Sequence, residues 1–412
     1  MNKQLGVLLS ISSLPSNHGI GDFGDSCYRF IDWLSENKYQ YWQVLPINPL
    51  GPGYSPYMST CSHALEYRYI SLDYLVKQGL LDHVPSHHKH CEEVDFYDVG
   101  NFKKKHLWKA YLRFNKAHPE TLHKFKFREP WVNEYATFEV FKELNDGKTW
   151  NEWKEEDLNY FKNHNNPPKH LLKKINFVIF LQYIALKQWK AILNYARKKD
   201  IKIICDMPFY VGFDGVECWL HRDQFSINSD NKLFEVGGVG PDAFSDVGQL
   251  WGTPIYNFEK MKEDNYHLLI ERVGYLAKLC DYLRLDHFRA FDTYYVIPAK
   301  DEDARFGQWK LGPGHEFFNL LYKEYPDINL IAEDLGDLRP EVLKLRDDFD
   351  LPGMFICEFT IFDLNNLSTN RQIVYPGTHD NETLWGWYQN LNEAQLSYNI
   401  LKKKHHFYMH HD

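Results

Sequence analysis

The residues of this chain whose types and spacing best suit chemistry lie in the stretch 282–289. Leu283 and Leu285 alternate there with Arg284 and Asp286, which predicts a short buried strand that ends in charged residues. Because Arg284 and Asp286 are two positions apart, both side chains point to one face, where the guanidinium can keep the carboxylate ionised and orient it. Taken alone, a structural Arg–Asp ion pair is the simpler interpretation.

Two further acidic clusters follow apolar runs, at 331–336 with Glu333 and Asp334, and at 377–381 with His379 and Asp380. Each has a structural alternative, a strand-to-loop cap for the first and a turn for the second. In a parallel barrel, catalytic groups lie at the carboxyl ends of strands. Cleavage of a glycosidic bond needs two carboxyl groups across the linkage. Three strand-end acids in order therefore predict chemistry on a glycosidic bond.

The elements that must position these acids are short apolar runs ending in polar residues. They are predicted as parallel strands at 6–14, 39–47, 202–211, 282–289, 329–336, 352–359 and 373–380. Helical patterns lie between them at 178–198, 316–325 and 340–348, and the segment 74–175 is predicted as a mainly helical insertion. This alternation predicts an α/β fold of the TIM (β/α)8-barrel type with inserted helical subdomains.

Composition excludes several classes of partner. A net charge of −9 and a pI near 6.1 argue against nucleic acid and anionic membrane surfaces. Aromatic residues form 16% of the chain, which indicates a bulky core and is also compatible with a cleft in which sugar rings stack. Seven scattered cysteines and the lack of a signal-peptide pattern predict a reduced, cytoplasmic protein. We expect no cofactor and no metal, and we interpret the histidine-rich tract 87–90 as solvated surface.

Long motifs run through most of the chain beside the acid clusters. They lie at 6–9, 12–15, 19–24, 42–46, 54–57, 180–183, 188–189, 206–211, 238–242 and 248–254. Together with the acids, these motifs closely resemble the 4-alpha-glucanotransferases (amylomaltases, or disproportionating enzymes) of glycoside hydrolase family 77, from about residue 5 to 387. The resemblance implies transfer of α-1,4-glucan segments between maltooligosaccharides by a retaining double displacement.

The resemblance also implies a role for each matching residue. Asp286 would be the nucleophile, Glu333 the general acid and then base, and Asp380 a transition-state stabiliser helped by His379. The remaining substrate-binding residues that it implies are Tyr54, Asp206, Trp251, Arg284 and Phe244. Glycines 237, 238 and 240 favour a flexible lid over 236–252, although they are equally compatible with simple turns.

The sequence departs from the family pattern in places. The run 62–67 stands where Asn-Pro is expected, and Glu358 stands where Gln is usual. The expected last strand and helix region is not recognisable, and 391–412 reads as an atypical polar tail, so we expect a C-terminally truncated chain. The predicted division is therefore 1–73 for barrel strands 1–2 and the sugar-contact loop, 74–175 for the insertion, 176–390 for strands 3–7, and 391–412.

Two alternatives to glucan transfer remain open from the sequence. A retaining α-glucan hydrolase would use the same acids with water as the acceptor. An inactive glucan-binding remnant would keep the acids without a closed barrel. The oligomeric state is not predictable from these residues.

Overall fold

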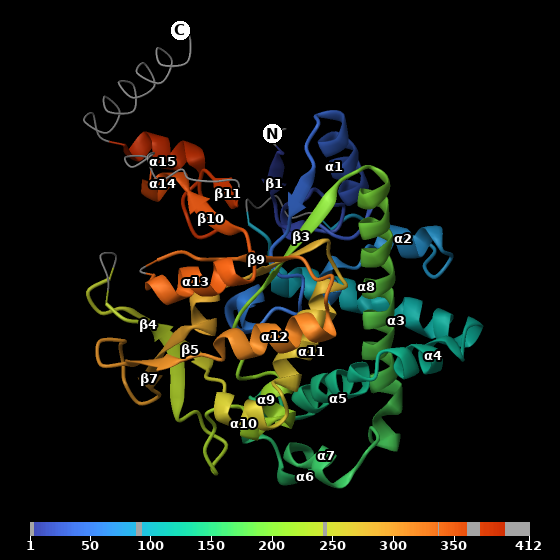
Figure 1. Ribbon diagram of the computed structural model, residues 1–412. Helices are drawn as coiled ribbons and strands as arrows, with labels where there is room; N and C mark the ends of the chain where they lie inside the picture. The colour runs from blue at the N-terminus through green and yellow to red at the C-terminus, as the bar shows by residue number, and fades with distance from the viewer. Residues whose placement is uncertain (1–3, 88–92, 242–244, 337, 361–370, 392–412) are drawn as a thin grey trace.

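The computed structural model describes residues 4–87, 93–241, 245–336, 338–360 and 371–391 (Figure 1). Its main sheet is parallel, with the strand order β1-β2-β3-β6-β9, and a second parallel pair joins β10 to β11. The backbone N–H of Ala332 donates to the carbonyl of Pro352 (2.9 Å), which links the end of β9 to the start of β10. These strands are β1 (Gly6–Leu8), β2 (Tyr41–Gln43), β3 (Lys202–Met207), β6 (Tyr282–Leu285), β9 (Leu330–Ala332), β10 (Gly353–Ile356) and β11 (Gln372–Tyr375).

All seven predicted parallel strands are present, each shorter than its apolar run, so the predicted α/β class is confirmed. The strands curl around a shared interior. Tyr375 of β11 donates its hydroxyl hydrogen to Oε1 of Gln43 in β2 (2.6 Å), and Leu8 of β1 packs with Met354 and Ile356 of β10. Among the described residues no strand follows β11, and the tail 392–412 lies outside the described part of the chain.

Helices cover the outside of these strands. The longest, α8, runs along one side of the molecule and packs against α1, α3, α4, α5 and β3 (Figure 1). It begins six residues before the predicted 178–198 segment because the apolar periodicity already starts at Leu172 and Ile175. The covering helices are α1 (Asp25–Glu36), α8 (Leu172–Lys198), α11 (His267–Ala277), α12 (Gly314–Glu324) and α13 (Pro340–Asp348).

The long connection from β2 to β3 carries most of the remaining helices. These are α2 (Leu72–Lys77), α3 (Phe96–Ala117), α4 (Thr121–Arg128), α5 (Trp131–Leu144), α6 (Glu155–Leu158) and α7 (Tyr160–Asn163). Shorter helices elsewhere are α9 (Val216–Leu220), α10 (Phe258–Glu263), α14 (Cys357–Thr360) and α15 (Leu384–Asn390). The 3-10 turns are η1 (Ile11–Ser13), η2 (Pro52–Tyr54), η3 (Pro56–Met58), η4 (Tyr67–Tyr69), η5 (Trp150–Glu152), η6 (Lys169–Leu171), η7 (Arg222–Gln224) and η8 (Phe288–Phe291). The division of the chain into the four segments given above stays a prediction.

An antiparallel sheet that the sequence analysis did not predict flanks the barrel, with the order β5-β4-β7-β8. Its strands are β4 (Glu235–Val239), β5 (Gln249–Pro254), β7 (Thr293–Pro298) and β8 (Gln308–Leu311). Gly237 and Gly238 therefore lie inside a strand, so the interpretation of these two glycines as part of a loop or turn is wrong, whereas the movement of 236–252 as a lid stays a prediction. A Cβ on Gly237 would lie 2.5 Å from Oγ1 of Thr253, and one on Gly238 would lie 2.2 Å from the carbonyl oxygen of Gln249. Close approach of neighbouring chain explains these two glycines.

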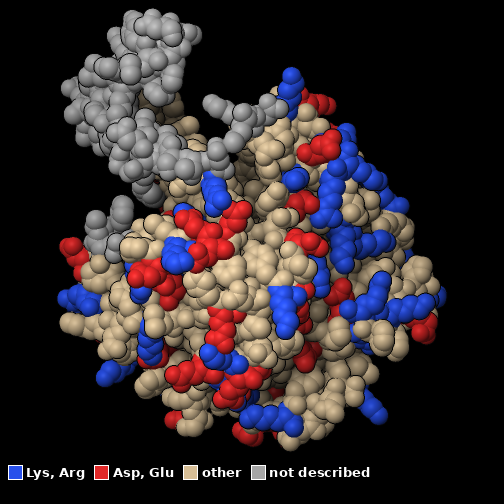
Figure 2. All heavy atoms as spheres, viewed as in Figure 1, with Lys and Arg blue, Asp and Glu red and all other residues tan. Residues whose placement is uncertain are grey.

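Acidic and basic side chains are interspersed over the face shown in Figure 2. None of the described helices is both long and apolar enough to cross a bilayer.

A buried lysine ties the opening loop to the inserted helices. Lys103 of α3 is fully buried, and its ammonium donates to Oδ2 of Asp22 (3.0 Å) and to the carbonyls of Arg68 (2.7 Å) and Ile70 (2.9 Å). All three ammonium hydrogens are thus used, which is the condition under which a buried charge is tolerated.

Replacement of Lys103 tests this anchor. Lys103→Met leaves Asp22 as a buried carboxylate without its partner, so we expect the free energy of unfolding to fall by about 3–5 kcal/mol. Urea denaturation measures this loss. The matched control is Lys105→Met on the exposed side of the same helix, which should change stability by less than about 0.5 kcal/mol. Equal free energies of unfolding for the two variants would contradict the stabilising role of Lys103.

Candidate active site

A buried guanidinium lies at the centre of the acids predicted from the sequence. Asp206 of β3 and Arg284 of β6 are direct cross-strand partners, so their side chains point to the same face. Nη1 of Arg284 donates to Oδ1 and Oδ2 of Asp206 (2.7 and 2.8 Å) and to Oδ1 of Asp286 (2.9 Å). The predicted Arg284–Asp286 pair is present, and Asp206 is the further member that the register brings to it.

The balance of charge in this group raises the pKa of two carboxyl groups. Burial raises the pKa of Asp286 to about 7, against the opposing effect of Arg284. Burial and the nearby Asp286 carboxylate raise the pKa of Glu333 to about 8. Because Arg284 contacts Asp286 directly, the negative charge is better stabilised on Asp286 than on Glu333. The group therefore favours an ionised Asp286 beside a protonated Glu333.

The turn after β6 fixes the position of Glu333. His287 adopts a left-handed conformation (φ 51°), and its backbone N–H donates to Oε2 of Glu333 (2.6 Å). The neighbouring Asp334 is used differently, because its Oδ1 accepts from the backbone N–H of Met354 (2.7 Å) and its Oδ2 accepts from Arg346 (2.5 Å). The strand-to-loop cap expected at 331–336 is therefore made by Asp334, whereas Glu333 belongs to the acid group.

His379 and Asp380 approach the group from the segment after β11. The ring of His379 stacks on Tyr57 with centroids 5.2 Å apart, and Tyr57 donates to Oδ2 of Asp206 (2.6 Å). Nε2 of His379 lies 3.3 Å from Oδ2 of Asp380, whose side chain is 75% exposed. The negative charge of Asp380 makes the smallest of the named contributions to the raised pKa of Asp286.

The aromatic residues predicted to contact substrate differ in how they lie relative to the acid group. Trp251 of β5 makes an edge contact with His287, with centroids 4.9 Å apart, and so borders the acid group. Tyr54 is exposed, has a positive φ of 58°, and stacks on Phe96 of the insertion, 5.2 Å between centroids. Among the described residues its ring contacts Phe96 and Arg68 rather than the acids. Phe244 lies outside the described residues.

Three residues that contact the acid group or its strand were missed by the sequence analysis. Tyr57 lies in the 54–57 motif, but its hydrogen bond to Asp206 joins residues 149 positions apart in the sequence, which no local pattern reveals. His287 stood next to Asp286, yet its role is carried by the backbone N–H, which no residue type reveals. Arg272 of α11 donates to the carbonyls of Pro208 and Phe209 just after β3 and supports the acid-bearing strand from outside.

The arrangement is suited to acid–base and nucleophilic chemistry on carboxyl groups. An ionised carboxylate and a protonated carboxylic acid in one site are the pair that a retaining glycosidase-type mechanism requires. In the described part of the chain, the one group of three potential metal ligands is Cys61, His63 and Glu217, which includes none of these acids.

Comparison with known proteins gives one family. The sequence model described as 4-alpha-glucanotransferase matches residues 9–412. The 4-alpha-glucanotransferase of Streptococcus pneumoniae is 36% identical over 96% of this chain and 81% of its own length. The enzyme of the same name from Aquifex aeolicus is 37% identical over 94% of this chain and 81% of its own length.

The fold has the same relatives. The amylomaltase of Streptococcus agalactiae, solved in complex with acarbose, superimposes with a TM-score of 0.90 at 34% identity, covering 96% of this chain and 83% of that one. The amylomaltase of Corynebacterium glutamicum, at 18% identity and a TM-score of 0.71, shares the fold. With the parallel strands and strand-end acids described above, the predicted TIM-type architecture is confirmed. The chain belongs to the 4-alpha-glucanotransferase family, glycoside hydrolase family 77.

Proposed function

We propose that this protein transfers α-1,4-glucan segments from one maltooligosaccharide to the 4-hydroxyl of another, with retention of the anomeric configuration. The observation that carries the proposal is the shared guanidinium. Arg284 contacts Asp206 and Asp286, and the pKa of Glu333 is raised beside them. Family membership supplies the substrate class, because the relatives are named for transfer of 4-α-glucan units.

The first half of the reaction forms a covalent intermediate. The Asp286 carboxylate attacks the anomeric carbon of the donor, and the bond from that carbon to the glycosidic oxygen breaks. Glu333 gives its proton to the departing oxygen, so the leaving chain ends in a neutral 4-hydroxyl. Arg284 holds the attacking carboxylate by a charge-assisted hydrogen bond and keeps it ionised in a partly buried site.

The second half reverses these roles with a new acceptor. The ionised Glu333 takes the proton of the incoming 4-hydroxyl, whose oxygen attacks the anomeric carbon and releases Asp286. Two inversions give net retention. We propose that Asp380 and His379 bind hydroxyls of the reacting sugar, since His379 stacks on Tyr57 beside Asp206.

Transfer rather than hydrolysis requires that a bound sugar outcompete water. Trp251, Tyr210 and His287 form a contiguous aromatic wall, with Trp251 4.9 Å from the His287 ring and 6.3 Å from Tyr210 between centroids. An apolar wall next to the acids lowers the local water content and gives a sugar face a surface to stack on. We propose that Tyr54 and Phe244 extend this contact to further sugar units.

The composition of the chain bears on where the enzyme acts and on its partners. We propose that it acts in the cytoplasm on soluble maltooligosaccharides, without nucleic acid or membrane partners, in line with its net charge of −9.

Incubation with maltotriose tests the proposed function. Transfer predicts glucose together with chains longer than maltotriose, at constant total reducing ends, when products are separated by size. Asp286→Asn should abolish the products, and Glu333→Gln should slow them by about 10²–10⁴-fold. Glu316→Gln, an exposed acid on α12 paired with Lys262, is the matched control and should keep wild-type turnover. Shorter products alone, with a rising number of reducing ends, would show a hydrolase. Wild-type turnover in Asp286→Asn would contradict the assignment of Asp286 as the nucleophile.

The pH dependence of kcat/KM follows from the two raised pKa values. Asp286 must be ionised, so the rate should rise with pH through about 7. Glu333 must be protonated, so the rate should fall as the pH rises through about 8. The two limbs belong to the coupled pair rather than to single residues. A rate that stays constant as the pH passes about 8 would contradict the assignment of Glu333 as the acid.

A further inference from the structure

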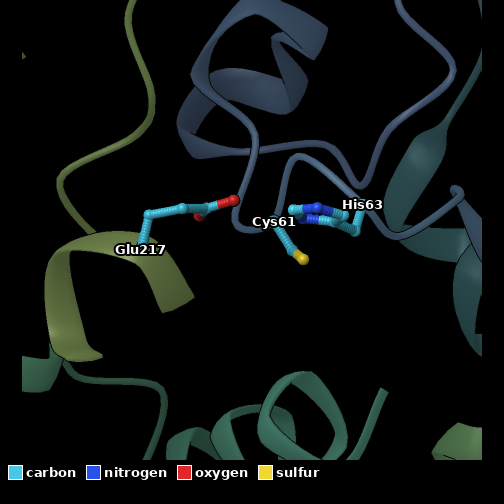
Figure 3. A group of neighbouring side chains, drawn as sticks. All are labelled: Cys61, His63 and Glu217. Carbon is cyan, nitrogen blue, oxygen red and sulfur yellow. The ribbon is translucent and has the colours of Figure 1, made fainter. Parts of the chain in front are cut away.

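A second cluster of reactive side chains lies in the segment after η3 and is not used by the proposed mechanism. Cys61, His63 and Glu217 are all buried, with exposed fractions of 1%, 8% and 3%. Their thiol sulfur, ring nitrogen and carboxylate oxygen all lie within 4.8 Å of one another. Figure 3 shows the Glu217 carboxylate reaching from α9 toward the loop that carries Cys61 and His63.

Two polar atoms of this cluster lack a partner in the described structure. Nε2 of His63 and Oε2 of Glu217 are buried, and neither makes a hydrogen bond. The other oxygen of Glu217, Oε1, accepts from the backbone N–H of Ser62 (2.7 Å), which fixes the carboxylate against the loop. Leaving a buried acceptor unpaired costs about 1–3 kcal/mol. Two such atoms in one compact cluster of metal-ligating residue types are the observation that favours a bound ion here.

We propose that Cys61, His63 and Glu217 form a buried zinc site with three protein ligands. A thiolate, an imidazole and a carboxylate are all established zinc ligands, whereas Ca²⁺ and Mg²⁺ prefer oxygen alone. The thiolate and carboxylate together carry two negative charges, so Zn²⁺ makes the buried cluster neutral.

The geometry allows this ion with small side-chain movements. Zinc–ligand bonds of about 2.0–2.3 Å put tetrahedral donor atoms about 3.3–3.8 Å apart. The widest pair of the cluster, at most 4.8 Å, needs to close by about 1 Å, which is within reach of side-chain rotation. Three protein ligands leave the fourth position for water.

The site would join two segments that are far apart in the sequence. Cys61 and His63 flank Ser62, whose hydroxyl accepts from Nε of Arg272 (2.7 Å), and Arg272 also donates to the carbonyl of Phe209 (2.6 Å) beyond β3. Zinc would therefore clamp α9 to the loop that is braced against the acid-bearing strand.

Cobalt substitution tests the site without relying on activity. The full-length protein is stripped with a chelator, dialysed and titrated with Co²⁺, and the near-ultraviolet thiolate-to-cobalt charge-transfer band is recorded. Zn²⁺ is then added to displace cobalt, bound zinc is measured by elemental analysis, and thermal unfolding is followed with and without the metal. Cys61→Ser and Glu217→Gln remove ligands. Cys218→Ser is the matched control, because Cys218 is a buried cysteine beside Glu217 that is not in the cluster.

The expected result is a thiolate–cobalt band, displacement by one equivalent of zinc, and a higher Tm with zinc. Cys61→Ser should lose the band and this equivalent, Glu217→Gln should weaken zinc binding by at least about tenfold, and Cys218→Ser should match the wild type. Absence of the band from the folded wild-type protein would overturn the proposal. So would a band that survives Cys61→Ser. If Cys61→Ser does not fold, unchanged zinc affinity in Glu217→Gln would overturn it equally.

Discussion

The site depends on one buried guanidinium shared among acids. Arg284 supplies a single positive charge inside the sheet, while Asp206, Asp286 and Glu333 bring three carboxyl groups to it. Burial lowers the pKa of the guanidinium, but these acids raise it well above its usual value, so it stays charged. One guanidinium cannot offset the charge of three carboxylates in a site of which Asp206 is buried and Asp286 and Glu333 are half-buried, so a proton remains on the carboxyl group that Arg284 contacts least. The chemistry of the site, an ionised nucleophile beside a protonated acid, follows from this imbalance.

Buried polar side chains hold the loops around this group. Gln182 of α8 pairs with both the N–H and the carbonyl of Leu65 (2.8 and 2.9 Å), and Gln188 does the same for Ser71 (2.8 and 3.2 Å). Lys103 and Arg272 bind further carbonyls on either side. The backbone groups of irregular segments cannot all pair with one another, and these four side chains satisfy the ones that would otherwise be unpaired. The proposed zinc site would add one more buried connection between the same loop and α9.

Local patterns in the sequence were sufficient to predict the parallel strands and the candidate catalytic acids. Short apolar runs bounded by polar or turn residues located all seven parallel strands, and the spacing of Arg284 and Asp286 predicted their contact correctly. Contacts that span long stretches of chain were not predictable in this way. The Asp206–Arg284 partnership depends on strand register, and Glu217 reaches a loop 155 residues away in sequence. The antiparallel sheet was missed because Gly237 and Gly238 resemble a loop in composition, although neighbouring chain forces glycine there.

The most direct test of this account is to trap the covalent intermediate. A glucosyl fluoride donor needs no acid for departure of fluoride, so the Glu333→Gln variant can form the intermediate but lacks the base that helps to resolve it. Rapid denaturation, digestion and mass spectrometry then locate the sugar. The account predicts a glucosyl group on the peptide that contains Asp286, in an ester with its side chain. A sugar attached to Asp206, or no adduct while fluoride is released, would contradict the assignment of Asp286 and the role of Arg284 in keeping it ionised.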